Sequence, residues 1–241
     1  MVPRPSSLHA LALLLAALPG HAGTPVPAQQ DAPPARLVVT PEGARLRTVL
    51  NGRAELVEHL GKKALTLVPA AETAGKDLDM LAILDAPAFR DGTLELELSG
   101  APRPDAPADS RGFVGLAFRT GERGEWSEVV YLRPTNARCD DQLRRNRSVQ
   151  YVSHPEYPWQ RLRQESPGKY ESYVDLEPGQ WTTLKLVVAG TSARLFVGGA
   201  AQPCLVVTDL KRGAVEGRIA LWAHVDTEAY FGTLTVMPRA P

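Results

Sequence analysis

Residues 134–173 contain the side chains best suited to bind a ligand, although this stretch shows no sustained strand or helix periodicity. Aromatic rings pack well on the apolar C–H faces of a sugar, and neighbouring prolines restrict the backbone that presents them. Sugar hydroxyls need directional hydrogen-bond partners, which arginine, amide and histidine side chains supply. We therefore expect these residues of the segment to bind a ligand: Asn136, Arg145, Asn146, Gln150, Tyr151, His154, Tyr157 and Trp159. The alternative is that the rings only cover one end of a core.

Neighbouring strands add candidates to this site through the alternation of their side chains. Alternation places these residues in the core: Leu94, Leu96, Val114, Leu116, Val130 and Leu132. The opposite faces then carry Arg119, Tyr131 and Arg133, and Trp222 lies on the outward face of a later strand. We expect these four residues to complete the binding surface.

A groove also needs space, and small residues on the outward face provide it. Gly115 and Ala117 lie on the same face as Arg119, so a ligand could approach the sheet closely there. The alternative for the charged residues is an exposed ion pair between Glu97 and Arg119, which would contribute little stability.

The elements that must position these residues are strands. Period-two alternation recurs in segments separated by turn residues, and Gly190 joins two runs into a predicted hairpin. The expected strands lie within residues 44–50, 55–61, 64–68, 92–100, 113–119, 181–189, 192–199, 218–225 and 229–236. No amphipathic helix is apparent. This pattern predicts an all-β antiparallel sandwich.

Taken in order, several of these segments resemble a known superfamily. They are "LGKKALTLV", "APAFRDGTLELELSG", "GFVGLAFR", "GQWTTLKLVVAGTSARLFVGG" and "GRIALWAHVDTEAYFGTLTV". The order resembles the concanavalin A-like lectin/glucanase superfamily, and within it laminin-G-like modules and 3-keto-disaccharide hydrolase domains. The resemblance covers residues 36–238 and implies a jelly roll of two curved antiparallel sheets, with carbohydrate commonly held on the concave one. The predicted function is carbohydrate binding by a lectin-like domain.

Two other functions stay open on the same residues. Glycoside hydrolysis uses a pair of carboxylates about 5–10 Å apart, but the Glu-x-Asp-x-x-Glu strand of the glucanase branch is missing, and "LELEL" offers only Glu95 and Glu97. A hydrolase of the keto-disaccharide type would need a pair drawn from other acids, which the sequence does not identify. The second alternative is a non-catalytic protein-interaction module, as laminin-G-like domains often are.

The first residues predict export. Residues 1–22 have an early arginine, a short apolar run and small residues, the order of a secretory signal peptide. Residues 23–35 form a tether rich in Pro and Ala, and residues 36–241 form the sandwich domain. No later run has the length of a membrane span. We expect a secreted or periplasmic protein.

Charge and cysteines bear on partners and cofactors. Lys plus Arg and Asp plus Glu both number 27, which indicates no preference for nucleic acid. Cys139 and Cys204 are expected to form a disulfide in an exported protein, and the alternative is two buried thiols. The spacing of the two cysteines does not suit a zinc site. We expect no metal ion and no other cofactor. A structural calcium ion, common in the superfamily, stays an open alternative, although the sequence has no dense acidic loop.

Overall fold

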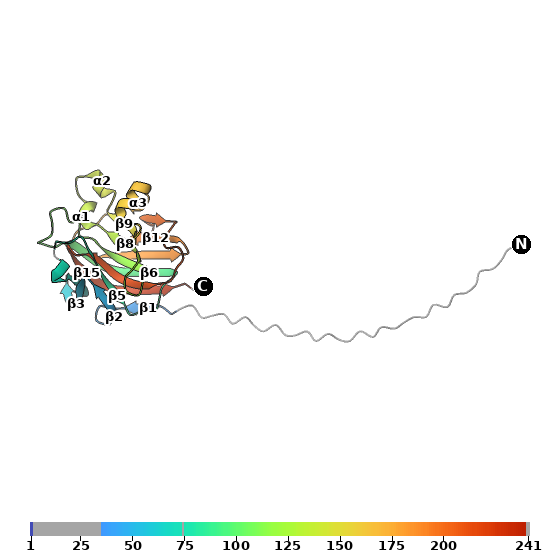
Figure 1. Cartoon of the computed structure of the whole chain (residues 1–241), viewed down its shortest axis with the longest axis horizontal. Coiled ribbons are helices and arrows are strands. Elements are labelled where there is room, and N and C mark those ends of the chain that lie inside the picture. The colour runs from blue at the N-terminus through green and yellow to red at the C-terminus, as the bar shows by residue number, and fades with distance from the viewer. Residues whose placement is uncertain (2–34, 74, 240–241) are drawn as a thin grey trace. The chain divides into compact units, whose positions relative to one another are not determined.

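The alternating segments form two antiparallel β-sheets that pack face to face (Figure 1). The structure, a computed structural model, describes residues 1, 35–73 and 75–239. The predicted signal peptide, apart from its first residue, and the tether up to residue 34 lie outside the described residues. The prediction of an all-β sandwich with two antiparallel sheets is confirmed.

The larger sheet has eight strands, in the order β13-β12-β11-β6-β15-β4-β3, with β1 paired to β15. Its strands are β1 (Leu37–Val39), β3 (Gly52–His59), β4 (Lys62–Pro69), β6 (Gly92–Pro102), β11 (Thr182–Ala189), β12 (Ser192–Val197), β13 (Leu205–Val207) and β15 (Thr227–Pro238). The predicted hairpin is β11–β12, and Gly190 adopts the positive φ of +57° that its tight turn requires.

The second sheet has seven strands, in the order β10-β9-β8-β7-β14-β5-β2. They are β2 (Leu46–Leu50), β5 (Asp79–Leu84), β7 (Val114–Thr120), β8 (Ser127–Leu132), β9 (Val149–His154), β10 (Glu171–Ser172) and β14 (Arg218–His224). Strands β5 and β9 are absent from the sequence prediction, because their residues alternate less clearly between apolar and polar, and so is the two-residue β10. Strand β8 is predicted only through the core positions of Val130 and Leu132.

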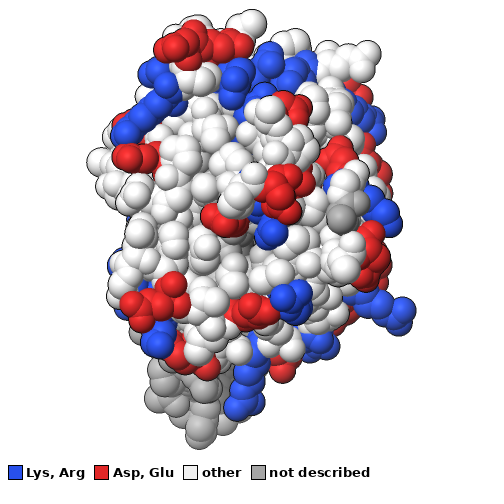
Figure 2. Space-filling view, turned by 90° about the vertical axis from the view of Figure 1, so that its left-hand side faces the viewer, with Lys and Arg blue, Asp and Glu red and all other residues white. Residues whose placement is uncertain are grey.

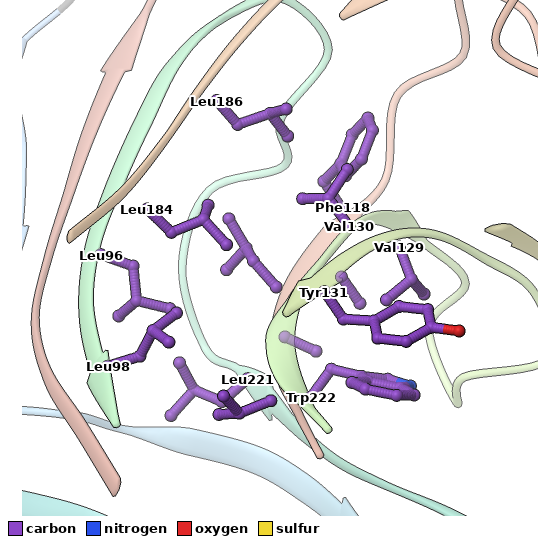
Figure 3. Packing of buried hydrophobic residues seen from close by; sticks show 14 of the residues in the cluster. Leu96, Leu98, Phe118, Val129, Val130, Tyr131, Leu184, Leu186, Leu221 and Trp222 are labelled. Carbon is purple, nitrogen blue, oxygen red and sulfur yellow. The ribbon is translucent and has the colours of Figure 1, made fainter. Parts of the chain in front are cut away.

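The core lies between the two sheets. Leucines of β6 and β11 face Phe118, Val130 and Leu221 of the second sheet (Figure 3). All six residues predicted to face the core are at most 1 % exposed. Figure 3 also shows Tyr131 and Trp222 side by side on the outer face of the seven-stranded sheet, away from the leucines.

The segment between β8 and β10 is more structured than the sequence suggests. Besides β9, it contains α1 (Pro134–Ala137), α2 (Gln142–Arg145) and α3 (Trp159–Glu165), which gather at one side of the sandwich (Figure 1). A 3-10 turn, η1 (Ala71–Thr73), follows β4. Asp141 caps α2 by accepting hydrogen bonds from the backbone N–H groups of Leu143 (2.9 Å) and Arg144 (3.2 Å). None of the described helices is long and apolar enough to cross a membrane.

Candidate functional site

A cavity of about 1000 Å³ opens where strands β7, β8 and β14 meet the loops at one end of the seven-stranded sheet. Four parts of the chain line it: residues 69–73 with 75–77, residues 103–113, the stretch from the end of β8 into α3, and residues 224–226. On the side of the molecule shown in Figure 2, acidic and basic side chains are interspersed around a broad uncharged area. The cavity is large enough for a small ligand.

Three aromatic rings lie on the outer face of the sheet next to the cavity. The ring centroids of Tyr131 and Trp222 are 4.7 Å apart, and those of Phe113 and Tyr131 are 5.5 Å apart. Tyr131 and Trp222 are both 3 % exposed. These two rings, which we expected to complete the binding surface, are therefore covered, and they lie beneath the cavity instead of being open to solvent.

The outer face is covered because the sheet is strongly curved. His154 of β9 and Asp79 of β5 approach to 3.4 Å between Nε2 and Oδ2, although three strands separate β9 from β5 in the sheet. Twist accumulated over the strands brings such opposite corners together on the concave face. Gly115 leaves no room for a ligand either, because a Cβ there would lie 2.2 Å from the oxygen of Val130. Its small size instead permits close pairing of β7 and β8.

Arg133 connects the buried rings to the cavity. Its guanidinium lies 5.2 Å from the ring centroid of Tyr131 and 5.9 Å from that of Trp159. Nη2 donates to the hydroxyl of Tyr131 (2.8 Å) and to Oε1 of Gln150 (3.2 Å). The side chain lines the cavity, is 5 % exposed as a residue, and its buried Nε has no hydrogen-bond partner among the described residues. Arg133, one of the predicted residues, therefore lies in the wall of the cavity.

Asn136, another predicted residue, holds the same wall of the cavity in place. Its Nδ2 donates to the backbone oxygen of Arg147 (3.1 Å), and its Oδ1 accepts from Nε of Arg144 at 3.4 Å. Arg111 lies nearby and also lines the cavity. Burial lowers the pKa of Arg111, and the positive charges of Arg144 and Arg133 lower it further, whereas Asp109 opposes the shift. Three guanidinium groups are therefore clustered on this wall.

Two other arginines of the lining share one carboxylate. Glu171 of β10, whose side chain is 7 % exposed, lies 2.7 Å from Nη2 of Arg163 and 3.1 Å from Nε of Arg147. Arg163 belongs to α3 and stacks on Trp159, with 4.5 Å between the guanidinium carbon and the ring centroid. Glu171 therefore anchors the helix that carries Trp159 at the cavity, where this indole is 37 % exposed.

Another part of the cavity wall carries a histidine between two carboxylates. Nε2 of His224 lies 2.9 Å from Oδ1 of Asp77, and its Nδ1 lies 3.6 Å from Oδ2 of Asp226. Burial raises the pKa of the neighbouring Asp79, while the charges of His154 and His224 oppose that shift. The cavity thus has a cationic wall and a wall with carboxylates and an imidazole.

Arg119 does not belong to this site, which corrects the prediction. It is fully buried, and its guanidinium donates to the backbone oxygens of Arg90 (2.9 Å), Gly190 (2.7 Å) and Gly213 and to the carboxylate of Asp91 (3.1 Å). Its φ of +49° interrupts the strand alternation, and the pairing between β7 and β14 is irregular at this level. The side chain therefore binds three loops together inside the protein.

Tyr151 also lies away from the cavity, in the core between the sheets. It is fully buried, its hydroxyl donates to Oε2 of Glu128 (2.5 Å), and it accepts from the backbone N–H of Lys211 (2.8 Å). The backbone N–H of Arg212 donates to Oε1 of Glu128 at 2.7 Å. Tyr151 pairs with Val130 across β8 and β9, which fixes its side chain on the core face. Its predicted role in ligand binding is wrong.

The remaining predicted residues surround the site without lining the cavity. Gln150 is buried and supports Arg133, and His154 contacts Asp79. Arg145 stacks on Tyr173 at 5.4 Å, Tyr157 carries Arg161 over its ring at 4.1 Å, and the exposed Asn146 accepts from Gln142 at 2.7 Å. The structure therefore brings only these predicted residues into the lining: Arg133, Asn136 and Trp159.

The expected disulfide between Cys139 and Cys204 is not formed, and both cysteines are free thiols. Sγ of Cys139 donates to the backbone oxygen of Asn136 (3.2 Å), and Sγ of Cys204 donates to that of Leu195 (3.4 Å). Burial raises the pKa of Cys204 to about 11. Within the described part of the chain, no group of three or more His, Cys, Asp or Glu residues is arranged to hold a metal ion.

Sequence reasoning missed several residues of the cavity. Arg111 and Phe113 lie just before β7, and Arg144 lies in the predicted segment beside Arg145. Asp226 follows His224 by two residues, whereas Asp77 reaches it from a loop that is distant in the sequence. A strand-end position is the one signal that could have identified Arg111 and Phe113, since side chains at strand ends meet at one edge of a sheet. Nothing in the sequence indicates that Asp77 meets His224.

Comparisons with known proteins identify the fold. No protein-family model matches the sequence, and no curated protein matches it. Among solved structures, the carbohydrate-binding module CBM66 of Bacillus subtilis is similar, with a TM-score of 0.52 and 14 % identity over 78 % of this chain and 94 % of that one. The calcium-bound exoplasmic/lumenal domain of VIP36 has a TM-score of 0.54 and 9 % identity, covering 84 % of this chain and 90 % of that one.

A third similar structure is a Bacillus subtilis protein of unknown function with a galectin-like fold, with a TM-score of 0.50 and 14 % identity over 87 % of this chain and 97 % of that one. At these identities the likeness concerns the fold alone. The predicted fold class, a sandwich of two antiparallel β-sheets, is confirmed, and its architecture is similar to that of these lectin-like structures.

Proposed function

We propose that this protein is a carbohydrate-binding, lectin-like domain that works outside the cytoplasm, secreted or in the periplasm. The ligand would occupy the cavity at the end of the seven-stranded sheet. Sugars present apolar C–H faces together with many hydroxyls, and the cavity offers aromatic rings beside arginine, asparagine and aspartate side chains. The combination suits an oligosaccharide better than an apolar ligand.

The observation that carries the proposal is the position of Trp159. Its ring is partly exposed at the cavity, where Arg163 stacks on it and leaves it accessible to a ligand. Helix α3 is short, but Leu162 is buried under it and Glu171 holds Arg163, so the ring is presented by a fixed element. A preorganised ring of this kind loses little conformational entropy when a sugar stacks on it.

The similar structures agree with this proposal. One of them is a carbohydrate-binding module, and the VIP36 domain has been solved with Man3GlcNAc, with a TM-score of 0.50 to this chain. Because identity is low, they support a class of ligand and name no sugar for this protein.

The test is a glycan array probed with the described domain and with Trp159→Ala. We expect at least one glycan to bind, and the variant to bind it about tenfold or more weakly, since loss of a stacking aromatic typically costs above 1 kcal/mol. Trp126→Ala is the matched control: Trp126 is similarly exposed (38 %) and also lies near an arginine, Arg212, but it does not line the cavity. Equal losses in both variants, or no binding to any glycan, would contradict the proposal.

A second candidate function is hydrolysis of the bound glycan. His224, held between Asp77 and Asp226 in the cavity wall, is an imidazole that could transfer a proton to or from a bound glycan. The same array hits, incubated with the protein and analysed for released sugars, separate the two functions. Turnover that disappears in His224→Ala supports a hydrolase, whereas binding without turnover supports a lectin.

A third function, a protein-interaction module, would leave the cavity without a sugar ligand. Absence of binding on the array, together with capture of a protein partner that is lost in a variant of the lining, would support it.

A further inference from the structure

We propose that the cationic wall of the cavity is a subsite for an anionic group of the glycan, a uronate carboxylate or a sulfate ester. The subsite is formed by Arg111, Arg133 and Arg144, and we call it the arginine subsite. This inference rests on the proposed function and makes it specific, because a neutral sugar would not need three guanidinium groups at one place.

Charge balance distinguishes these three arginines from the other arginines of the lining. Arg147 and Arg163 share Glu171, and Arg103 pairs with Asp105 at 3.1 Å. In contrast, none of the three arginines of the subsite forms a salt bridge with a described carboxylate. These salt bridges therefore neutralise the other arginines of the lining. The positive charge that is left is concentrated on the three arginines of the subsite.

The hydrogen bonds of the three side chains are also incomplete. Nε of Arg133 is buried with no partner among the described residues, and a buried donor without an acceptor costs free energy. The interactions of Arg144 with Asn136 Oδ1 are long, at 3.4 and 3.5 Å, and Nη1 of Arg111 donates only to the adjacent backbone oxygen of Ser110 at 3.3 Å. An oxyanion in the cavity would give these groups the acceptors that the protein does not.

Repulsion between the guanidinium groups of the arginine subsite also favours an anionic ligand. The charges of Arg144 and Arg133 both lower the pKa of Arg111, so the three groups lie near enough to destabilise one another. Arg133 is further held in place by Tyr131, Gln150 and the surrounding rings. Like charges fixed together in this way are typical of anion-binding sites, where the ligand supplies the missing counter-charge.

The acidic groups of the cavity do not neutralise this wall. Asp77 and Asp226 contact His224 on the other wall, and Asp109, although near Arg111, is exposed and forms no salt bridge with it. Sugar hydroxyls can donate to these carboxylates while an anionic substituent reaches the arginines. The arrangement therefore favours an acidic glycan over a nucleic acid, whose regularly spaced phosphates would meet the carboxylates as well.

The ligands of the test are matched pairs that differ in charge. They are oligogalacturonate and its methyl ester, and a sulfated galactan oligosaccharide and its desulfated form. The dissociation constants of the full domain are measured by calorimetry at low salt. We expect the charged member of at least one pair to bind about tenfold or more tightly, and this preference to shrink as salt is added. Which pair shows it distinguishes a carboxylate from a sulfate.

The variants are also matched. Arg144→Gln and Arg111→Gln are expected to lose most of the preference for the charged member. Arg145→Gln is the control, since it removes the same charge from the adjacent position of α2, but Arg145 stacks on Tyr173 and does not line the cavity. Thermal unfolding of each variant establishes that it is folded.

Each outcome either supports or overturns the inference. Equal binding of neutral and charged members overturns the arginine subsite but leaves the carbohydrate proposal intact, whereas no binding of any glycan overturns both. An equal loss of preference in Arg145→Gln shows a general charge effect and overturns the subsite. Tighter binding of a single-stranded oligonucleotide than of every glycan, abolished in Arg144→Gln, overturns the assignment to a glycan.

Discussion

Glu128 is a carboxyl group enclosed between the two sheets of the sandwich. It is fully buried and accepts hydrogen bonds from Tyr151 and from the backbone of Arg212. Burial raises its pKa, and these hydrogen bonds oppose the shift only in part. Glu128 lies on the core face of β8, outside the cavity, so its effect should appear in stability and not in binding.

The raised pKa predicts a pH dependence with a definite sign. The folded state retains the Glu128 proton above the ordinary pKa of 4.5, where the unfolded state has lost it. The free energy of unfolding should therefore contain a component that falls as pH rises from about 4.5 through the folded-state pKa. In Glu128→Gln this component should be absent, as measured by urea unfolding at a series of pH values.

Glu125→Gln is the control for that measurement. The pKa of Glu125 is lowered, mainly by hydrogen bonds from the backbone N–H groups of Glu125 and Arg123, so its contribution has the opposite sign. Its replacement should leave the fall with pH in place. The prediction for Glu128 is wrong if its glutamine variant shows the same fall as the unchanged protein.

At the scale of elements, the segment between β8 and β10 depends on interactions with neighbouring strands. Helices α1, α2 and α3 are each shorter than two full turns. Helices of this length are not stable alone. Leu162 buried under α3, Asn136 bound to the backbone of Arg147, and Glu171 between two arginines supply the missing stability. Contacts with neighbouring strands therefore hold this wall of the cavity in place.

Glu171→Gln should therefore loosen the element that carries Trp159. The change leaves Arg147 and Arg163 without a counter-charge in a partly buried place, and we expect the free energy of unfolding to fall by about 2 kcal/mol. Hydrogen exchange of the α3 amides should accelerate more than that of the core strands.

Glu165→Gln provides the comparison within the same helix. Glu165 pairs with Arg161 at 2.7 Å, but both side chains are about half exposed, so loss of that pair should change stability little. Similar effects of the two substitutions on α3 exchange would show that Glu171 has no special role as an anchor.

At the scale of the whole molecule, the curved sheet determines where a ligand can bind. Curvature brings His154 to Asp79 across the outer face and buries Tyr131 and Trp222 there. The accessible space is consequently displaced to the end of the sheet, where loops from four parts of the chain surround the cavity. In the proposed function, a ligand would therefore enter from the loops and would not lie along the middle of the sheet.

Export is a prediction about the whole chain. Expressed with residues 1–22 in place, the protein should be recovered outside the cytoplasm with Gly23 as its first residue, as N-terminal sequencing would show. Leu14→Arg places a charge in the apolar run and should retain the uncleaved chain inside the cell. Cytoplasmic recovery of the unchanged protein beginning at Met1 would contradict the prediction.

The sequence by itself determined the sandwich and the direction of most core side chains. Successive side chains of a strand point to opposite faces, so the apolar residues of an alternating segment are the ones that become buried. The β11–β12 hairpin and the core positions of Leu94, Val114 and Val130 follow from that pattern. The sequence also indicated the segment between β8 and β10 as part of the site, and Arg133, Asn136 and Trp159 within it.

Only the tertiary structure decided which rings and charges reach the ligand. Arg119 turned inward at an irregular pairing, Tyr151 took its face from its register with Val130, and Trp222 was enclosed by the curvature of the sheet. Bulges, register and twist depend on contacts between strands that are distant in sequence. The proposed arginine subsite has the same origin, since Arg111 before β7 and Arg144 of α2 line one cavity although they are distant in the sequence.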